Sequence, residues 1–568
     1  MSRRAVGYAV GLAWAIIASA MGPVVAQPIR FEVGEAVHTQ IRNDAFGIQY
    51  HRNTYSAADA LAKLDVLPLT SVRLWAYPSE FHPEPGVWDW TELDAQIAEV
   101  TAAGYTPWVC LFQAEDWYTG TQETPWWNDA DARAEWVVTA QALAARYADT
   151  VDRWIVFDEI NYLHSDRSYY MPLTTSVDLY LAAAEAIRTE DPEAEIGGPS
   201  GFAGWENGYW AQRVLAAPDG SRQLDFISSN LFLSWNAADT DEQIMDRTIW
   251  YEEAPLRIRE MAGEEPTLVL DAYNASALWT RDGTPTGELW TDPRNVNTFG
   301  GVYQAAALLH ALKGGFDVTL RWETLGGFGI LRWYPGFEKR APYYAWQMVV
   351  EAGRLMPGSE LVEIQTTEAP REGMPHHSGQ NVAGYRVQPF ALRDAEGLSV
   401  VLLNKYVEAK SVELAVPYST GEAELYRFDA DRHASSVDPL REIGSVRGGE
   451  LLPLDLPGLS VTVLRFGASQ PTAIEDAARS DSPARLQAIA PNPIRQTGEV
   501  RVELAQPLEI TLEVLTADGR QVASLVSSWR SHGLHTIPFD ASGLSAGTYF
   551  ARLCAAGACT SRPLTVAR

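Results

Sequence analysis

Eight short apolar segments alternate with helical segments between residues 45 and 322, and this alternation constrains the fold more than any other feature. Each apolar segment has the length of a strand, and the segments between them carry apolar residues at helical spacing. Eight such units in succession predict a closed (β/α)8 barrel, an α/β fold whose chemistry lies at the C-terminal ends of the strands. The predicted strands are 45–50, 71–75, 105–112, 154–158, 195–198, 226–230, 267–271 and 318–322, and the predicted helices include 93–103, 132–147, 176–189 and 302–312.

The rest of the chain divides around this barrel, which we assign to residues 28–352. Residues 1–26 combine two arginines, an apolar stretch and small residues before a cleavage-like site, which predicts a secretory signal peptide; a retained membrane anchor is the alternative. Residues 353–467 are mostly alternating strand patterns with turns, which predicts an all-β sandwich. We expect 468–484 to be an exposed linker and 485–568 to form a small, immunoglobulin-like β-sandwich.

Charge and cysteine content exclude several functional classes. The net charge of −29 argues against a nucleic-acid partner and indicates a strongly hydrated surface. Three cysteines are too few for a disulfide framework or a cysteine-based zinc site. Cys110 is expected to be buried, whereas Cys554 and Cys559 flank a turn and predict a hairpin disulfide, with two free thiols as the alternative. With no metal spacing or phosphate-binding glycine loop, we expect no cofactor and no metal.

An acidic pair ends the fourth predicted strand. Hydrolysis of a glycosidic bond needs two carboxyl groups, one as proton donor and the other as nucleophile or base. Glu159 is the strongest candidate for the donor, because burial beside Trp154 and Phe157 would raise its pKa. Asp158 precedes it, and adjacent side chains on a regular strand point to opposite faces, so we expect one of the two to be structural. The alternative is that Glu159 only caps the following loop.

Several segments together resemble one clan of enzymes. They are residues 46–47 (Phe-Gly), 71–75 (Ser-Val-Arg-Leu-Trp), 86–94 (Gly-Val-Trp-Asp-Trp-Thr-Glu-Leu-Asp), the surroundings of Glu159, and 339–346 (Lys-Arg-Ala-Pro-Tyr-Tyr-Ala-Trp). Over about residues 40–467 the chain resembles retaining (β/α)8 glycosidases, especially the family of β-xylosidases and α-L-iduronidases. The resemblance implies glycosidase activity with Glu159 as the acid/base.

The chain departs from that family at several site positions. Asp158 stands where relatives carry the asparagine that binds the sugar 2-hydroxyl, and Asp158 could accept that hydrogen bond. Aligning Tyr273 with the tryptophan of the relatives' Thr-Glu-Trp-Asn motif puts Ala272 at the nucleophile position. Asp271 is one residue away, and a one-residue shift or a bulge would restore it to the site. We therefore predict Asp271 as the second catalytic carboxylate, ahead of Glu323.

Sugar rings stack on aromatic side chains and need a few fixed polar groups. Side chains of both kinds lie at or near the predicted strand ends, although core packing is an alternative for each aromatic residue. The predicted substrate-binding residues are Arg73, Trp75, Asp158, Asn161, Asn230, Tyr273, Trp322 and Glu323.

The C-terminal region carries a second resemblance. Residues 490–493 (Ala-Pro-Asn-Pro), 515–520 (Leu-Thr-Ala-Asp-Gly-Arg), 533–535 (Gly-Leu-His) and 544–550 (Leu-Ser-Ala-Gly-Thr-Tyr-Phe) form a spaced set. This set resembles the C-terminal sorting domain of the type IX secretion system. The resemblance implies a secreted or cell-surface protein with the outer-membrane secretion machinery as a partner; an ordinary adhesive immunoglobulin-like module is the alternative.

Together these features predict a secreted glycoside hydrolase. It would cleave O-glycosidic bonds of a plant- or algal-type polysaccharide or oligosaccharide by a two-carboxylate mechanism. The alternative is a catalytically altered or inactive barrel that acts as a carbohydrate-binding protein at the cell surface.

Overall fold

The computed structural model falls into two compact units, Met1–Ala468 and Ser469–Arg568, which are described separately. The predicted signal peptide and most of the predicted linker lie outside the described residues. The structure describes residues 28–567 except 51–56, 114–124, 162–170, 203–205, 279–290, 334–335, 370–384, 417–421, 432–443, 448–450, 468–483, 491–493, 505–506, 517–519, 532 and 556–557.

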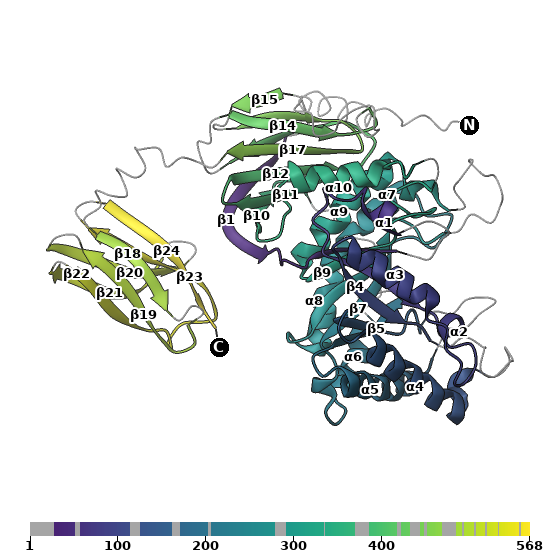
Figure 1. Ribbon diagram of the computed structural model, residues 1–568. Helices are drawn as coiled ribbons and strands as arrows, with labels where there is room; N and C mark the ends of the chain where they lie inside the picture. Colours follow the sequence, from purple (N-terminus) through teal and green to yellow (C-terminus); the bar gives the residue numbers. More distant parts are fainter. Residues whose placement is uncertain are drawn as a thin grey trace, which may run out of the picture. The chain divides into compact units, whose positions relative to one another are not determined.

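Eight parallel strands of the first unit close into a barrel, which confirms the predicted (β/α)8 fold (Figure 1). Each strand pairs with its neighbour in chain order, and the last pairs with the first. The strands are β2 (Phe46–Gln49), β3 (Ser71–Ala76), β4 (Thr106–Leu111), β5 (Arg153–Val156), β6 (Glu195–Phe202), β7 (Phe226–Phe232), β8 (Thr267–Asn274) and β9 (Val318–Arg321).

Both faces of these strands are buried, which explains why the sequence shows apolar runs instead of strict alternation. Inward side chains such as Trp108, Cys110 and Val269 fill the barrel interior. Outward side chains such as Val109 and Leu270 belong to the larger core beneath the helices. Cys110 is buried, as predicted, and free.

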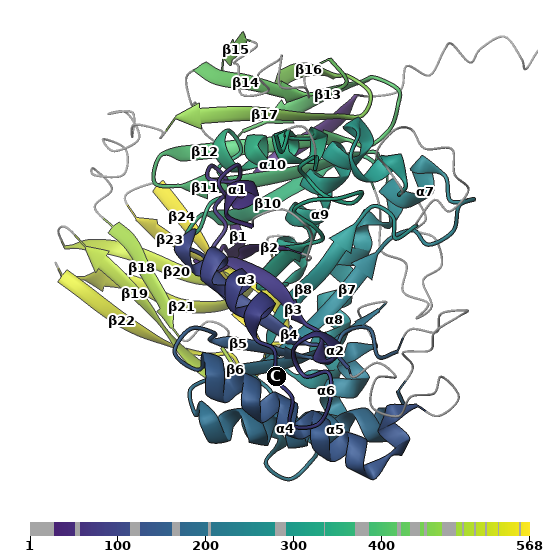
Figure 2. The same ribbon diagram turned by 45° about the vertical axis from the view of Figure 1, so that its right-hand side comes forward.

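The helices cover the outside of the barrel. Almost every residue of α9 (Thr298–Gly314) is buried, because this helix lies between the barrel and an adjoining sheet, where no face is left for solvent (Figures 1 and 2). The other helices are α1 (Ala57–Leu61), α2 (Pro78–Phe81), α3 (Thr91–Ala102), α4 (Ala130–Tyr147), α5 (Leu173–Glu190), α6 (Asn207–Leu215), α7 (Asp241–Asp246), α8 (Trp250–Ala262) and α10 (Ala341–Glu351).

The adjoining sheet has nine strands, in the order β15-β14-β17-β12-β11-β10-β1-β13-β16. One face encloses an apolar core of its own, with Phe31, Leu402 and Phe466 among its members, whereas Phe390 and Val463 on the other face join the barrel core. The strands after the barrel are β10 (Glu360–Thr366), β11 (Val387–Asp394), β12 (Gly397–Asn404), β13 (Lys410–Ala415), β14 (Glu422–Phe428), β15 (Gly444–Arg447), β16 (Leu452–Leu456) and β17 (Ser460–Gly467).

One strand of this sheet comes from the opposite end of the unit. Strand β1 (Ile29–Gln40), drawn in purple among green strands in Figure 1, pairs antiparallel with β10 and parallel with β13. From the sequence, these residues were predicted to belong to the barrel, within 28–352. The structure instead places them in the sheet, because their alternating apolar residues complete the core of that sheet.

The second unit is a small all-β fold, as expected for residues 485–568. Its two sheets, of three and four strands, enclose one apolar core that includes Val502, Leu512 and Phe539. Cys554 is disulfide-bonded and faces Cys559 in the register of a hairpin. The strands are β18 (Ala484–Ala490), β19 (Thr497–Leu504), β20 (Leu508–Thr516), β21 (Gln521–Arg530), β22 (Gly533–Asp540), β23 (Gly547–Ala555) and β24 (Ala558–Val566).

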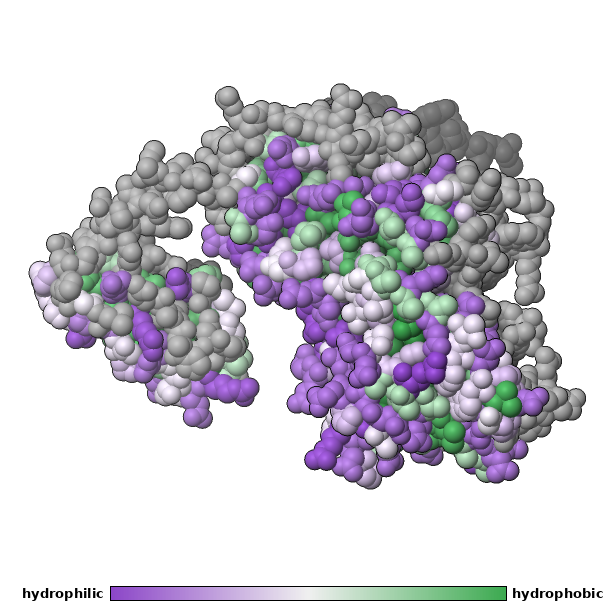
Figure 3. Space-filling view, viewed as in Figure 1, coloured by the Kyte–Doolittle hydropathy of each residue, from purple (hydrophilic) through white to green (hydrophobic). Residues whose placement is uncertain are grey.

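In the view of Figure 3, hydrophilic residues cover most of the described surface and hydrophobic residues form small patches. Within the described part of the chain, no helix is long and apolar enough to cross a membrane.

Candidate active site

Five polar side chains meet at the C-terminal ends of strands β3, β5, β7 and β8. They are Arg73, Asp158, Glu159, Asn230 and Asp271, which we call the acid cluster. All five were predicted from the sequence as catalytic or substrate-binding residues. Their position agrees with the rule that chemistry in a (β/α)8 barrel lies at the C-terminal face.

The backbone after β5 turns so that Asp158 and Glu159 face the same amide. Phe157 and Glu159 both have positive φ, at 77° and 53°, which interrupts the strand alternation. Asn230 Nδ2 donates to Asp158 Oδ1 at 3.2 Å and to Glu159 Oε1 at 3.1 Å. The expectation that these two acids point to opposite faces is therefore wrong.

Two contacts hold this turn in place. Gln113 binds the backbone of Asp158 twice, accepting from its N–H at 3.2 Å and donating to its carbonyl oxygen at 2.8 Å. The backbone N–H of Glu159 donates to the carbonyl oxygen of Ser200 on β6, at 3.1 Å. Neither Gln113 nor Ser200 was predicted from the sequence, although Gln113 directly follows a predicted strand.

Arg73 is fully buried and joins the two aspartates of the cluster. Its Nη2 lies 3.0 Å from Asp158 Oδ1, and its Nε lies 3.2 Å from Asp271 Oδ1. Nη1 donates to Gln49 at 2.8 Å, and the guanidinium stacks over the ring of Trp75, 4.3 Å from its centre. Arg73 thus forms ion pairs with both Asp158 and Asp271. When both carboxylates are ionised, the cluster has an excess of negative charge.

Asp271 reaches the cluster through a strand irregularity of the kind expected from the sequence. The register of β7 and β8 shifts at this point, because Ser229 pairs with Leu270 whereas Asn230 pairs with Ala272. The side chain of Asp271 is completely buried, with Ser200 as its second partner beside Arg73. Asp271 is therefore inside the barrel, beneath the partly exposed Asp158 and Glu159.

The surroundings keep the pKa values of the buried acids high. Loss of solvation, reinforced by the charge of Asp158, raises the pKa of Glu159 to about 8. The hydrogen bond from Asn230 lowers this pKa, but by less. Burial also raises the pKa of Asp271, to about 6, although the nearby Arg73 acts in the opposite direction. Glu159 is therefore protonated at neutral pH, as a proton donor must be.

Glu323 and Trp322 follow β9 beside the cluster. Trp322 is partly exposed and meets Trp75 edge to face, with ring centres 5.1 Å apart. Trp75 Nε1 in turn donates to Asp158 Oδ2 at 3.4 Å. Glu323 is almost fully buried against Gly326, and burial raises its pKa to about 8. The Trp75–Trp322 pair is thus the aromatic surface nearest to Asp158 among the predicted residues.

Two predicted substrate-binding residues lie elsewhere. Tyr273 points away from the barrel axis, because the register shift turns it outward, and its hydroxyl accepts a hydrogen bond from Gln304 of α9 at 3.0 Å. Asn161 binds the backbone of Phe202 through both ends of its amide, at 2.8 Å each, and also Glu206. The structure does not bring either residue into the acid cluster.

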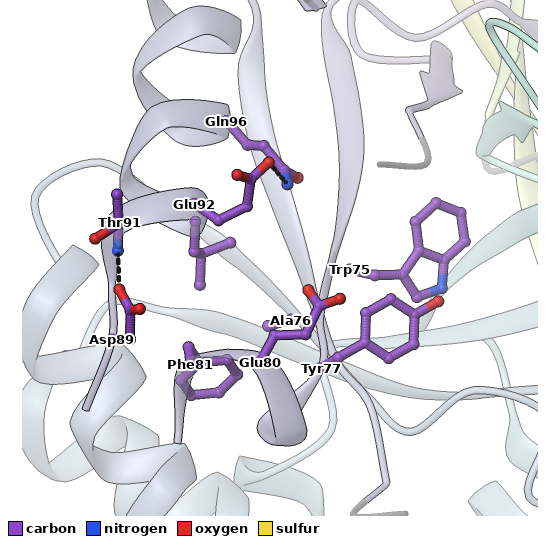
Figure 4. A pocket seen from close by; sticks show the side chains of 10 residues that line it. Trp75, Ala76, Tyr77, Glu80, Phe81, Asp89, Thr91, Glu92 and Gln96 are labelled. Carbon is purple, nitrogen blue, oxygen red and sulfur yellow. Dashed lines mark hydrogen bonds between the residues drawn. The ribbon is translucent and has the colours of Figure 1, made fainter. Parts of the chain in front are cut away.

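A pocket of about 330 Å³ is lined by Trp75, the side chain that also contacts Arg73 and Asp158 of the cluster (Figure 4). Tyr77 and Glu80 line it from the segment after β3, and Glu92 and Gln96 line it from α3, where they share a hydrogen bond of 3.2 Å. From the sequence, the segment 86–94 was singled out only for its resemblance to a family. Asp89, Thr91 and Glu92 of this segment line the pocket, and this run of polar side chains was the signal that could have indicated it.

Among the described residues, no group of three or more His, Cys, Asp or Glu side chains is arranged to hold a metal ion. Asp158 and Glu159 are the partly exposed members of the acid cluster, so these two residues are the ones that a bound molecule can reach.

No protein-family model matches this chain, and no curated protein matches it in sequence. Similar solved structures include the α-L-arabinofuranosidase of Thermotoga maritima (TM-score 0.54, 14% identity, 78% of this chain and 99% of that one). The GH39 β-xylosidase of Caulobacter crescentus (0.53, 14%, 78% and 100%) and the GH30 endoxylanase of Clostridium papyrosolvens (0.52, 14%, 78% and 100%) are also similar. At these identities the likeness establishes a shared fold.

Proposed function

We propose that this protein is a glycoside hydrolase that cleaves O-glycosidic bonds of a polysaccharide or oligosaccharide, with Glu159 as general acid/base. The observation that carries the proposal is the carboxyl group of Glu159, a partly exposed residue at the C-terminal end of a barrel strand, whose pKa of about 8 is raised by loss of solvation. The similar structures, which are glycoside hydrolases, support this reaction class.

The test is release of reducing sugar from a panel of polysaccharides and aryl glycosides by the full chain. Glu159→Gln should reduce turnover by about 10²- to 10⁴-fold, because the amide cannot donate a carboxyl proton. Glu193→Gln is the matched control, since Glu193 is exposed and precedes the N-terminal end of β6, at the end of the strand opposite to the cluster. Equal activity of the two variants would remove Glu159 from the mechanism.

The second candidate function is a non-catalytic carbohydrate-binding barrel. The complete burial of Asp271, the predicted second carboxylate, favours this candidate. Measurable affinity for a glycan without turnover of any member of the panel would establish it in place of the hydrolase.

The proposal includes export. A cleaved signal peptide and a C-terminal sorting domain of the type IX kind would deliver the chain to the cell surface or medium, with the secretion machinery of the outer membrane as partner. The support is the sequence resemblance of residues 485–568 together with the small β-sandwich that they form.

A further inference from the structure

The acid cluster leaves one carboxylate in a position to act with Glu159 on a bound sugar. Asp271 is completely buried behind Arg73 and Ser200, so it cannot reach an anomeric carbon without leaving both partners. Glu323 lies against Gly326, and with a pKa near 8 it is neutral at pH 7, which makes it a poor nucleophile. Asp158 remains, with 15% of its side chain exposed.

Asp158 is placed beside Glu159 instead of opposite to it. One amide group, that of Asn230, donates to both carboxyl groups, so their oxygens share one side of the site. A two-carboxylate mechanism needs the groups on opposite faces of the sugar ring, about 5 Å or more apart across the scissile bond. Asp158 is therefore poorly placed to attack the anomeric carbon while Glu159 protonates the leaving oxygen.

The contacts of Asp158 suit it to hold a substrate N–H. A carboxylate has about four acceptor positions. Donors from Arg73, Trp75 and Asn230 account for three of them in the described part of the chain. The position left over, on a partly exposed carboxylate, can accept one more hydrogen bond from a ligand.

The charge of the cluster favours a cation close to Asp158. Arg73 contributes one positive charge, and Asp158 and Asp271 contribute two negative charges when both are ionised, while Glu159 is neutral. A positive charge that develops on a bound sugar beside Asp158 would thus be stabilised at a site already fixed for it.

We infer that the substrate is a 1,2-trans glycoside of a 2-acetamido-2-deoxy sugar, whose own acetamido group is the nucleophile while Asp158 holds its N–H and Glu159 protonates the leaving group. This inference rests on the proposed glycosidase function and narrows its substrate class. It replaces the sequence-based expectation of a plant- or algal-type glycan. The trans relation is required because the acetamido oxygen must approach the face opposite to the leaving group.

The reaction has two steps, and water is the only reactant that they need besides the glycoside. In the first, the acetamido oxygen bonds to C1, the bond from C1 to the glycosidic oxygen breaks, and Glu159 gives its proton to that oxygen. The resulting oxazolinium carries a positive charge next to Asp158, which accepts the hydrogen bond of its N–H. In the second, water bonds to C1 and gives a proton to Glu159, the bond from C1 to the acetamido oxygen breaks, and the amide is restored with retained configuration.

The test compares 4-nitrophenyl β-glycosides of N-acetylglucosamine and N-acetylgalactosamine with those of glucose, galactose and xylose. We expect the acetamido substrates to be preferred by about 10⁴-fold in kcat/KM, because a site built for an N–H rejects analogues that lack it. With mono-, di- and trifluoroacetamido substrates, kcat should fall with each fluorine, since fluorine weakens the attacking oxygen. Asp158→Asn should lower kcat by about 10²- to 10³-fold, while the control Glu193→Gln should not.

The outcomes separate this inference from the function on which it rests. Cleavage of the 2-hydroxy glycosides with equal or greater efficiency would leave the glycosidase standing and overturn the acetamido mechanism. A kcat that does not change with fluorination of the acetamido group would also overturn the acetamido mechanism and leave the glycosidase standing. Failure to cleave any glycoside in either group would overturn the acetamido mechanism. The glycosidase itself would fall only if the polysaccharide panel also released no reducing sugar.

Discussion

The side chain of Gln113 holds Asp158 by both polar groups of its backbone, accepting from the N–H and donating to the carbonyl oxygen. Asp158 lies between two residues with positive φ, a conformation that costs energy for side chains other than glycine. The two hydrogen bonds therefore help to fix the turn that presents both acids to Asn230.

Gln113→Ala tests this relationship. The substitution leaves two backbone groups unpaired beside the barrel interior, and each buried unpaired group costs about 1–3 kcal/mol. We expect a lower free energy of unfolding in denaturant titrations and a fall in kcat larger than any rise in KM. The exposed Gln212→Ala, on α6, is the control for helix and amide effects. An unchanged kcat in a folded Gln113→Ala variant would show that the turn is held by other contacts.

The pH dependence of turnover follows from the pKa of Glu159. The protonated form is the active acid, and the pKa is about 8, so kcat should be high at lower pH and fall as the pH rises through about 8. Stopped assays between pH 5 and 10 would measure this limb. An activity that rises through pH 8 would mean that Glu159 acts in its ionised form from the start.

Asp271→Asn separates a catalytic role for Asp271 from a positioning role. The amide keeps the size of the side chain and removes its charge, which changes how Arg73 is held. We expect kcat to fall by at most about 10²-fold through misplacement, with the dependence on acetamido fluorination unchanged. If this folded variant is as inactive as Glu159→Gln, Asp271 becomes the second carboxylate that was predicted from the sequence.

Glu323→Gln should stabilise the protein in alkaline solution. The pKa of Glu323 is about 8 in the folded chain, against an ordinary value of 4.5, so the unfolded chain loses this proton first as the pH rises. Stability therefore declines between these two values, and the glutamine variant lacks that decline. The Tm difference between variant and parent should be larger at pH 9 than at pH 5. A difference that is the same at both values would mean that Glu323 is not protonated in the folded state.

Removal of residues 485–568 tests export. In a native host, the truncated chain should accumulate in the periplasm, because the proposed sorting signal is missing. Fractionation with a periplasmic marker enzyme measures the distribution. Surface delivery of the truncated chain at the level of the full chain would contradict the sorting role.

The barrel was predictable because its signals are local. Each strand is an apolar run between turn residues, and each occurs at the predicted place, with ends that differ by a few residues. Glu159 was recognisable for the same reason, since it directly ends such a run. Closure of the barrel then brings Arg73, Asn230 and Asp271 to it without further information.

What the sequence did not reveal depends on backbone geometry and distant pairing. Phe157 and Glu159 adopt positive φ although neither is a glycine, so the sequence does not indicate this conformation. The prediction assumed regular strand alternation and therefore placed Asp158 and Glu159 on opposite faces. The register shift beside Asp271 was anticipated, but its second effect, an outward Tyr273, was not. The local sequence also does not show which strands β1 pairs with, so the start of the barrel was wrongly predicted at residue 28.

The place of β1 in the nine-stranded sheet has a consequence for how the first unit is assembled. Its partners, β10 and β13, follow the entire barrel along the chain, so the strand made first is among the last that can pair. Pairing across such a separation slows folding. Once formed, the pairing of β1 joins the segment before the barrel to the strands that follow it. The barrel segment between them is then held at both ends. The barrel and the sheet are therefore mechanically connected, and a force applied at residue 28 acts on the sheet before it reaches the barrel strands that carry the acid cluster.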